Sequence, residues 1–166
     1  MDPASTNADL RIERTLRNQS ETEMLAARLS NVARRGDVIA LVGDLGAGKT
    51  VFARAFIRAR LRAEDEVPSP TFTLVQVYEP ASLQDPAIWH FDLFRLDPAE
   101  DVLELGIEDA FAQGISLIEW PNRLGGLLPT YRLDVILTHT GDAESRRVLI
   151  EGGADWRRRL REAGIA

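Results

Sequence analysis

The sequence contains no cysteine and only two histidines among its 166 residues. The absence of cysteine excludes disulfide bonds, thiolate zinc sites and cysteine nucleophiles, and it leaves the redox compartment undetermined. No apolar run approaches the roughly 20 residues that a membrane-spanning helix needs, so we expect no membrane partner. The segment MDPASTNADL lacks the basic start and the apolar stretch of a secretion signal. We therefore expect a cytoplasmic protein whose residues 1–10 form a loosely ordered tail.

Basic residues are fewer than acidic residues in this sequence. The chain carries 20 Lys and Arg against 26 Asp and Glu, which gives a formal net charge of -6. A protein that grips a nucleic-acid backbone by itself usually presents a basic surface. We expect no DNA partner, and contact with RNA would need a local basic patch or a partner protein. The length and the 45% hydrophobic content are typical of one globular domain over residues 1–166.

Strand and helix patterns alternate along the chain. DVIALVG and GISLIEWP are short apolar runs typical of strands buried on both faces, whereas AIWHFDLFRL, YRLDVILTHT and RRVLIEG alternate with period two. We expect a helix with a capping box formed by Ser20 and Glu23, a second in KTVFARAFIRARLR, and a third in ADWRRRLREAG capped by Asp155. DPAEDVLELG and IEDAFAQ predict short helical pieces. The alternation predicts a single α/β domain.

The stretch GDLGAGKT, residues 43–50, stands between an expected strand and an expected helix. In that context G-x-x-x-x-G-K-[ST] is a phosphate-binding loop. Its glycines let backbone amides turn toward phosphate oxygens, Lys49 can reach the β- and γ-phosphates, and the Thr50 hydroxyl can ligate Mg²⁺. We therefore predict that Lys49 serves both binding and catalysis. The predicted nucleotide-binding residues of this loop are Gly43, Asp44, Leu45, Gly46, Ala47, Gly48, Lys49 and Thr50.

Two further strands end in carboxylates that could complete a phosphoryl-transfer site. ISLIE puts Glu119 at the tip of an apolar run, which is the placement of a Walker B acid, and WHFD puts Asp92 on the same strand face as His90. Phosphoryl transfer needs an acid near the metal and a group that orients the attacking water. We predict that Asp92 and Glu119 are catalytic and that Thr50, Glu119 and Asp92 hold the metal.

Some residues near these motifs keep two interpretations. Asp44 is either a turn-forming aspartate or a catalytic one, and His90 is either a core histidine or part of the site. Trp120 either contacts nucleotide or anchors the end of its strand. The hydroxyls of SPTFT, Thr71 among them, belong either to a loop that senses the γ-phosphate or to a polar loop leading into a strand. We include Thr71 among the candidate catalytic residues and Trp120 among the nucleotide-binding ones.

The motifs GDLGAGKT, SPTFTLV, HFDLFRL, ELGIEDAF and LIEWP, in this order and at this spacing, resemble the bacterial TsaE family, also called YjeE. The resemblance runs from about Ser20 to about Ile150. Phe72 and Phe94 stand where the family often has tyrosine, and Val51 where a second threonine is common. These departures remove hydroxyls and leave the charged groups in place.

The resemblance implies a P-loop NTPase-like domain with a mixed parallel and antiparallel sheet of about seven strands flanked by helices. It implies a Mg²⁺-dependent ATPase that works with TsaB and TsaD in forming N6-threonylcarbamoyladenosine in tRNA and contacts tRNA through that complex. We expect slow hydrolysis by the isolated protein. The resemblance assigns the phosphate and metal positions to Lys49 and Thr50, the acids to Glu119 and Asp92, and a switch-like role to Thr71. It also places the start of the first helix, at Gln19 and Thr22, near adenosine.

Two other functions compete with an ATPase. A small-molecule kinase needs an acceptor pocket and usually an arginine-bearing lid, and the sequence has no separate insertion of that kind. A nucleotide-gated binding module would use the same loop without hydrolysis. A preference for guanine nucleotides is disfavoured, because no Asn-Lys-x-Asp stretch is present.

Overall fold

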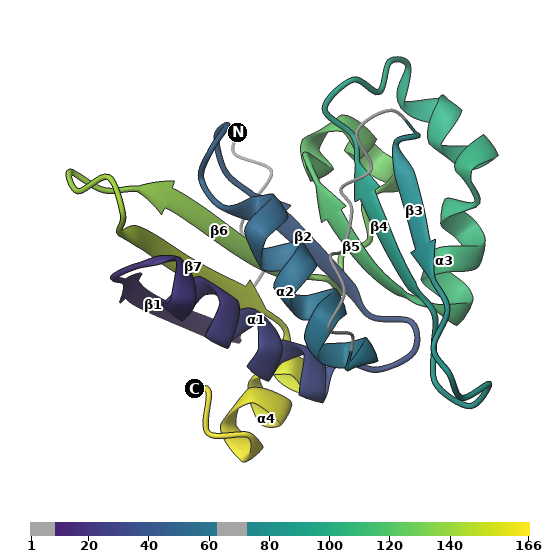
Figure 1. Cartoon of the computed structure of the whole chain (residues 1–166). Coiled ribbons are helices and arrows are strands. Elements are labelled where there is room, and N and C mark those ends of the chain that lie inside the picture. Colours follow the sequence, from purple (N-terminus) through teal and green to yellow (C-terminus); the bar gives the residue numbers. More distant parts are fainter. Residues whose placement is uncertain (1–8, 63–72) are drawn as a thin grey trace.

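The computed structural model describes residues 9–62 and 73–166. It contains a seven-stranded sheet with the strand order β1-β7-β6-β2-β5-β4-β3, flanked by helices (Figure 1). The α/β class and the mixed sheet are therefore confirmed. The elements in chain order are β1 (Leu10–Leu16), α1 (Gln19–Val32), β2 (Val38–Val42), α2 (Lys49–Leu61), β3 (Val75–Tyr78), β4 (Ile88–Asp92), η1 (Ala99–Leu105), α3 (Ile107–Gln113), β5 (Ile115–Glu119), η2 (Pro121–Leu127), β6 (Leu133–His139), β7 (Arg146–Gly152) and α4 (Ala154–Glu162).

The central strands are parallel and the outer pairs are antiparallel. Strand β2 pairs in parallel with both β5 and β6, and β4 pairs in parallel with β5. The pairs β1–β7, β6–β7 and β3–β4 are antiparallel. Parallel strands end at the same edge of a sheet. The carboxyl ends of β2, β4 and β5 therefore meet at one edge, where the candidate site lies.

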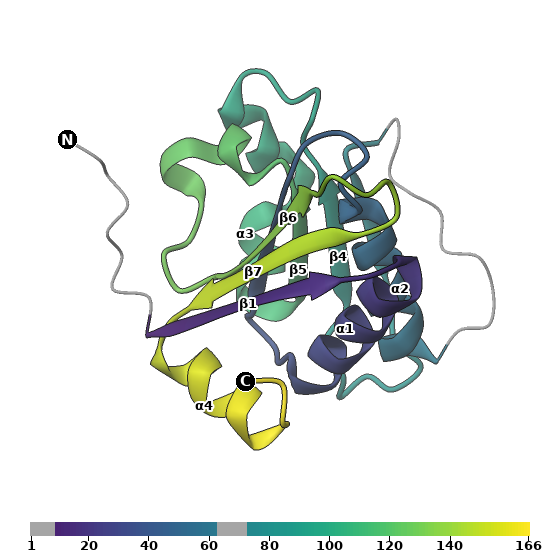
Figure 2. The ribbon, with the colours of Figure 1, turned by 90° about the vertical axis from the view of Figure 1, so that its left-hand side faces the viewer.

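Hydrophobic clusters cover both faces of the sheet. Helices α1 and α2 cover one face, and α3 lies on the other (Figures 1 and 2). The predicted alternation in β4 is confirmed, because Ile88 belongs to the cluster under α1 and α2 while Phe91 belongs to the opposite cluster. Phe52 and Phe56 of α2 are fully buried in the first cluster. None of the described helices has the length and apolar character needed to cross a membrane.

The N-terminal segment contains a strand that the sequence patterns did not predict. Residues 1–8 of the expected tail lie outside the described residues, whereas Leu10 begins β1 and is buried. Strand β1 pairs with β7 along its length, from Leu10 opposite Gly152 to Leu16 opposite Arg146. Its interior residues are mostly charged and exposed, which is usual for an edge strand and hides the apolar pattern.

Helix α1 begins two residues earlier than its predicted capping box requires. The helix is capped by Asn18, whose side-chain oxygen accepts a hydrogen bond from the Glu21 amide at 3.0 Å. The prediction that Ser20 caps with Glu23 was wrong. The helix starts at Gln19 because β1 ends at Leu16 and the chain turns immediately afterwards. Asn18 can cap it because asparagine is as good an N-cap as serine.

The C-terminal helix also starts differently from the prediction. Gly153 is its N-cap, and Asp155 lies in the first turn, so the predicted Asp155 cap was wrong. The Asp155 carboxylate instead accepts a hydrogen bond from Arg158 and forms an ion pair with Arg159, both of its own helix. Arg159 is buried and bonds both carboxylate oxygens of Asp37, at 2.7 and 3.0 Å. Arg159 therefore tethers α4 to the turn before β2.

Candidate functional site

The loop of residues 43–50 leaves β2 and enters α2 in a conformation that needs glycine. Gly46 and Gly48 have φ values of 75° and 107°, in the region that disfavours residues with a Cβ. A Cβ on Gly43 would lie 2.6 Å from the carbonyl oxygen of Leu137 in β6. The chain at Gly43 therefore lies directly against the end of β6, and Gly48 forms the N-cap of α2. The predicted strand, glycine turn and helix are confirmed.

Lys49 is the first residue of α2 and is held beneath the loop. Its ammonium donates to the carbonyl oxygen of Gly43 and, at 2.9 Å, to that of Asp44. The same nitrogen lies 4.2 Å from the centroid of the Trp120 ring. Burial lowers the pKa of Lys49, and nearby carboxylates, Glu119 first, oppose that shift. The ammonium is thus held by neutral oxygens that a stronger anionic partner could replace.

Glu119 connects the loop to its neighbouring strands. Thr50 Oγ1 donates to one carboxylate oxygen of Glu119 at 2.7 Å, and His90 Nε2 lies 2.7 Å from the other. Glu119 is 2% exposed and His90 is fully buried. The structure therefore resolves the two interpretations of His90, which is both a core residue and a direct neighbour of the candidate acid.

Asp92 lies beside Glu119 because the two residues are paired in the β4–β5 register. Its Oδ1 accepts a hydrogen bond from the Phe94 amide at 3.2 Å. Burial raises the pKa of Asp92, and the negative charge of Glu119 raises it further. With Lys49, Thr50 and Trp120, these two acids line a cavity of about 240 Å³, which we call the carboxylate pocket.

A second cavity lies on the other side of the loop. It measures about 500 Å³, and we call it the α1-side pocket. Both cavities are lined by Gly46, Gly48 and Val51, so the loop separates them. The predicted residues Gln19 and Thr22 lie here, next to the loop. The remaining lining residues are Asn18, Ser20, Ala47, Ala143, Glu144 and Arg146.

Sequence reasoning missed the contribution of the β6–β7 hairpin to this second pocket. Arg146 is the first residue of β7 and has the same strand parity as Val148 and Ile150, which are fully buried in the cluster under α1 and α2. That parity was the available signal, because side chains two residues apart share a face of the sheet. Arg146 therefore projects toward α1 and the loop, and Arg147 toward the opposite face.

Other predicted residues have more limited support. Thr71 lies outside the described residues. Asp44 is exposed, and its hydrogen bonds to Lys49 and to the Ala47 amide use its main-chain carbonyl. Leu45 is 69% exposed at the tip of the loop. Trp120 borders the carboxylate pocket under Lys49, and its contact with nucleotide stays a prediction.

The oxygen donors of the carboxylate pocket suit Mg²⁺. Among the described residues no cluster of three or more His, Asp or Glu could hold a metal by itself. Mg²⁺ is usually bound by one or two carboxylates together with water and the phosphates of a substrate. In such a shared site the hydroxyl would come from Thr50 and the carboxylates from Glu119 and Asp92. The protein would then provide only part of the coordination shell, which agrees with the absence of a larger ligand cluster among the described residues.

The fold and the loop define the class of P-loop proteins, in which a glycine-rich turn followed by Lys-Thr joins a central parallel strand to a helix. The family model described as "Threonylcarbamoyl adenosine biosynthesis protein TsaE" matches residues 16–148. The chain belongs to the TsaE family. The resemblance that the motifs indicated is thereby confirmed.

Relatives and a solved structure agree with this assignment. The tRNA threonylcarbamoyladenosine biosynthesis protein TsaE of Rickettsia felis is 38% identical over 122 residues, which cover 74% of this chain and 70% of the relative. The protein of the same name from Bacillus subtilis is 38% identical over 129 residues, covering 76% and 77%. The crystal structure of Bacillus subtilis YdiB superposes with a TM-score of 0.75 at 27% identity and covers 93% of this chain and 95% of that one.

Proposed function

We propose that this protein binds and hydrolyses Mg·ATP and thereby supports formation of N6-threonylcarbamoyladenosine in tRNA, together with TsaB and TsaD. The observation that carries the ATPase part is the 2.7 Å hydrogen bond between the Thr50 hydroxyl and Glu119. This bond joins the phosphate loop to an acid on the neighbouring strand, as phosphoryl transfer requires. Family membership and the names of the relatives support the pathway, and the partners are those that the family resemblance implies.

The loop provides the binding half of the mechanism. The triphosphate would lie against the amides of the loop and the N-terminus of α2, where unpaired N–H groups and the helix dipole favour anions. Lys49 would exchange the carbonyls of Gly43 and Asp44 for phosphate oxygens, which are stronger acceptors. The Trp120 ring beneath the ammonium limits how far this side chain can move away from the loop.

The two acids provide the chemical half. Glu119 would fix the Thr50 hydroxyl at the metal position, while His90 holds the other oxygen of the same carboxylate. Asp92 is next to Glu119 and uses one oxygen for the Phe94 amide, so its second oxygen can orient a water molecule. A raised pKa makes the Asp92 carboxylate a better acceptor of the proton from that water. Bound Mg²⁺ supplies charge neutralisation at the β- and γ-phosphates.

The local charge explains why a cation would be required. The carboxylates of Glu119, Asp92 and Asp44 all act on the Lys49 ammonium. Lys49 is also the only lysine in the sequence. A triphosphate entering this region without a divalent cation would meet these three carboxylates, and solvent could not efficiently screen the buried Glu119.

The single lysine allows a direct test of nucleotide binding. An amine-selective acylating reagent can modify only Lys49 and the N-terminal amine, and mass spectrometry distinguishes these positions. We expect Mg·ATP to protect Lys49 and adenosine to give no protection, because phosphates must cover the ammonium. The N-terminal amine is the internal control. Unchanged Lys49 labelling at saturating Mg·ATP would contradict the proposed binding mode.

A reconstituted reaction tests the pathway. TsaB, TsaD, tRNA and this protein, in wild-type and Lys49→Ala forms, should be assayed for N6-threonylcarbamoyladenosine and for released phosphate. We expect repeated turnover with the wild type and loss of turnover with the variant. Equal modification without this protein would contradict the role, and label transferred from ATP to a small molecule would favour a kinase.

A further inference from the structure

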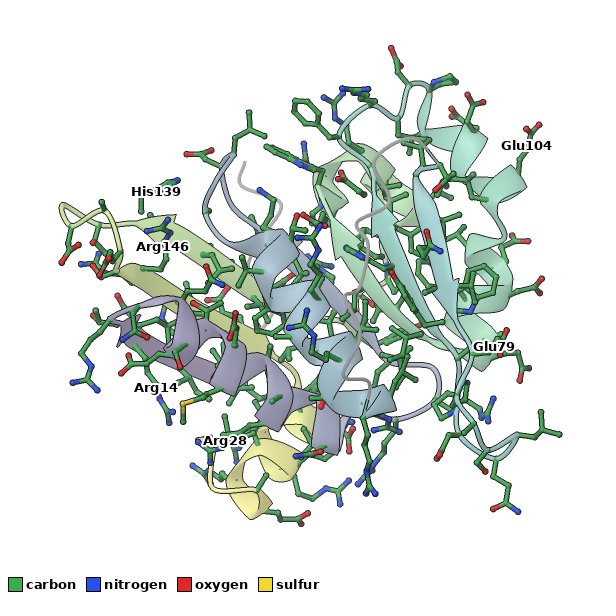
Figure 3. The ribbon with its side chains drawn as sticks, viewed as in Figure 1. Arg14, Arg28, Glu79, Glu104, His139 and Arg146 are labelled. Atoms are coloured by element: carbon green, nitrogen blue, oxygen red, sulfur yellow. The ribbon has the colours of Figure 1, made fainter. Side chains whose placement is uncertain are left out.

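The β6–β7 hairpin holds the outer side of the phosphate loop mainly through Arg146, and His139 makes a second contact with the loop. The Arg146 guanidinium donates to the carbonyl oxygens of Gly46 at 3.1 Å and Ala47 at 3.2 Å. It also donates to the carbonyl oxygens of Ala143 and Ser145, both at 2.8 Å. Figure 3 shows Arg146 and His139 on this hairpin, beside the loop that leads into α2. Arg146 therefore joins two loops through main-chain acceptors alone.

These bonds fix the direction of peptide planes. In a planar trans peptide the C=O and the following N–H point in opposite directions. Because the Ala47 carbonyl turns toward Arg146, the Gly48 N–H turns away from it. His139 Nε2 lies 3.2 Å from the carbonyl oxygen of Leu45 and would orient the Gly46 N–H in the same way.

The loop needs such an external constraint because of its glycines. Gly46 and Gly48 flank the Ala47 peptides, and neither has a Cβ to restrict rotation of the neighbouring peptide planes. The Ala47 amide is already bonded to the carbonyl of Asp44, so it stabilises the turn. The peptide that joins Ala47 to Gly48 is held through its carbonyl oxygen, which accepts a hydrogen bond from Arg146.

Arg146 also differs from its neighbour in charge pairing. Among the described residues no carboxylate forms an ion pair with Arg146. Arg147 projects from the opposite face and lies 3.7 Å from Glu13 of β1. The two arginines therefore carry the same charge in the same strand, and only one touches the loop.

We propose that Arg146 is a positioning residue for phosphate binding: its guanidinium holds the Gly46 and Ala47 carbonyls outward and so directs the Gly48 N–H toward the ligand. The inference rests on the proposed function and deepens it. The fork geometry of the guanidinium is essential, because adjacent carbonyls require donors in a fixed arrangement, which a lysine ammonium lacks. The ligand recognised is the phosphate chain and not the nucleoside.

The experiment is calorimetry with two probes, Mg·ATP and magnesium tripolyphosphate, on the wild type and three variants. Arg146→Ala is expected to weaken binding of both probes about tenfold, the effect of losing one or two hydrogen bonds that orient the loop. Arg146→Lys should restore less than half of that loss on a logarithmic scale. Arg147→Ala, the matched control, removes the same charge from the other face and should leave both affinities within about twofold.

A second measurement separates positioning from folding. Thermal unfolding should show that the variants are folded at the temperature of calorimetry. The ¹⁵N–¹H NMR signal of Gly48 should broaden or shift in ligand-free Arg146→Ala and stay in place in Arg147→Ala. If Arg146→Ala does not fold, Arg146→Lys carries the same test.

Each contrary result overturns a stated part. Full affinity in Arg146→Lys would show that charge alone matters, and a loss confined to Mg·ATP would show that Arg146 contacts the nucleoside. Unchanged binding of both probes by Arg146→Ala, with the wild type binding normally, would overturn this inference and leave the proposed function intact. Failure of the wild type to bind either probe would overturn both.

Discussion

The two cavities beside the phosphate loop differ in the groups that line them. The carboxylate pocket contains the buried pair Glu119 and Lys49 together with Asp92. The α1-side pocket is larger and is lined by side-chain amides and hydroxyls, including those of Gln19 and Thr22, and by the charged residues Glu144 and Arg146. The loop backbone is the wall between them. If the proposed function holds, phosphoryl chemistry belongs to one side and nucleoside recognition to the other, so substitutions on the two sides should affect different quantities.

The largest effect on nucleotide binding is expected at Lys49, on the loop between the two cavities. Lys49→Ala removes the only ammonium beneath the loop and should weaken Mg·ATP binding by about a hundredfold, because hydrogen bonds to charged groups contribute more than neutral ones. Calorimetry measures this loss. Arg35→Ala, which removes a cation that bonds the Gln113 and Gln84 carbonyls away from the loop, is the control and should bind normally. Equal affinities in both variants would contradict the phosphate role of Lys49.

The next effect should appear in hydrolysis and spare binding. Glu119→Gln preserves the shape of the side chain but removes its charge, and we expect phosphate release to fall by roughly a hundredfold or more while affinity changes by only a few fold. Asp92→Asn should behave similarly, because the two carboxylates act together. Radiolabelled phosphate release and equilibrium binding measure the two quantities separately. Full hydrolysis by a double Asp92→Ala, Glu119→Ala variant would contradict the assignment of the acids.

Removal of Mg²⁺ should reveal the negative charge of the carboxylate pocket. Without the cation, ATP affinity is expected to fall about tenfold, since the phosphates then meet the negative charges of Glu119, Asp92 and Asp44 around Lys49 without a divalent ion to balance them. Asp44→Asn should reduce this loss because it removes one exposed charge. A magnesium titration of binding in both proteins tests the prediction, and identical magnesium dependence would show that Asp44 has no influence.

The smallest effect should come from the α1-side pocket. Gln19→Ala is expected to weaken Mg·ATP binding about threefold and to leave magnesium tripolyphosphate binding and the hydrolysis rate at saturation unchanged. Gln113→Ala, at the end of α3, is the control. If Gln19→Ala weakened binding of Mg·ATP and of magnesium tripolyphosphate equally, the proposed separation of roles between the two cavities would be wrong.

Local patterns were sufficient where one segment determines its own structure. GDLGAGKT between an apolar strand and an amphipathic helix predicted the loop, because its glycines, lysine and threonine are consecutive. The same holds for β5, whose apolar run ends at Glu119, and for β6 and β7, whose residues alternate. Strand β1 was missed because an edge strand with charged residues has no apolar period. Asn18 was missed because several residues near it are equally good caps.

The sequence alone determined which chemical groups are available: a phosphate loop, one lysine, two strand-end acids and the family motifs that accompany them. Only the tertiary structure decided how they combine. The β4–β5 register pairs Asp92 with Glu119, burial brings His90 to the same carboxylate, and the antiparallel return of β7 brings Arg146 to carbonyls about a hundred residues earlier in the chain. The reason is physical, since strand register and the packing of helices on a sheet are set by the whole core and not by the residues that meet at its edge.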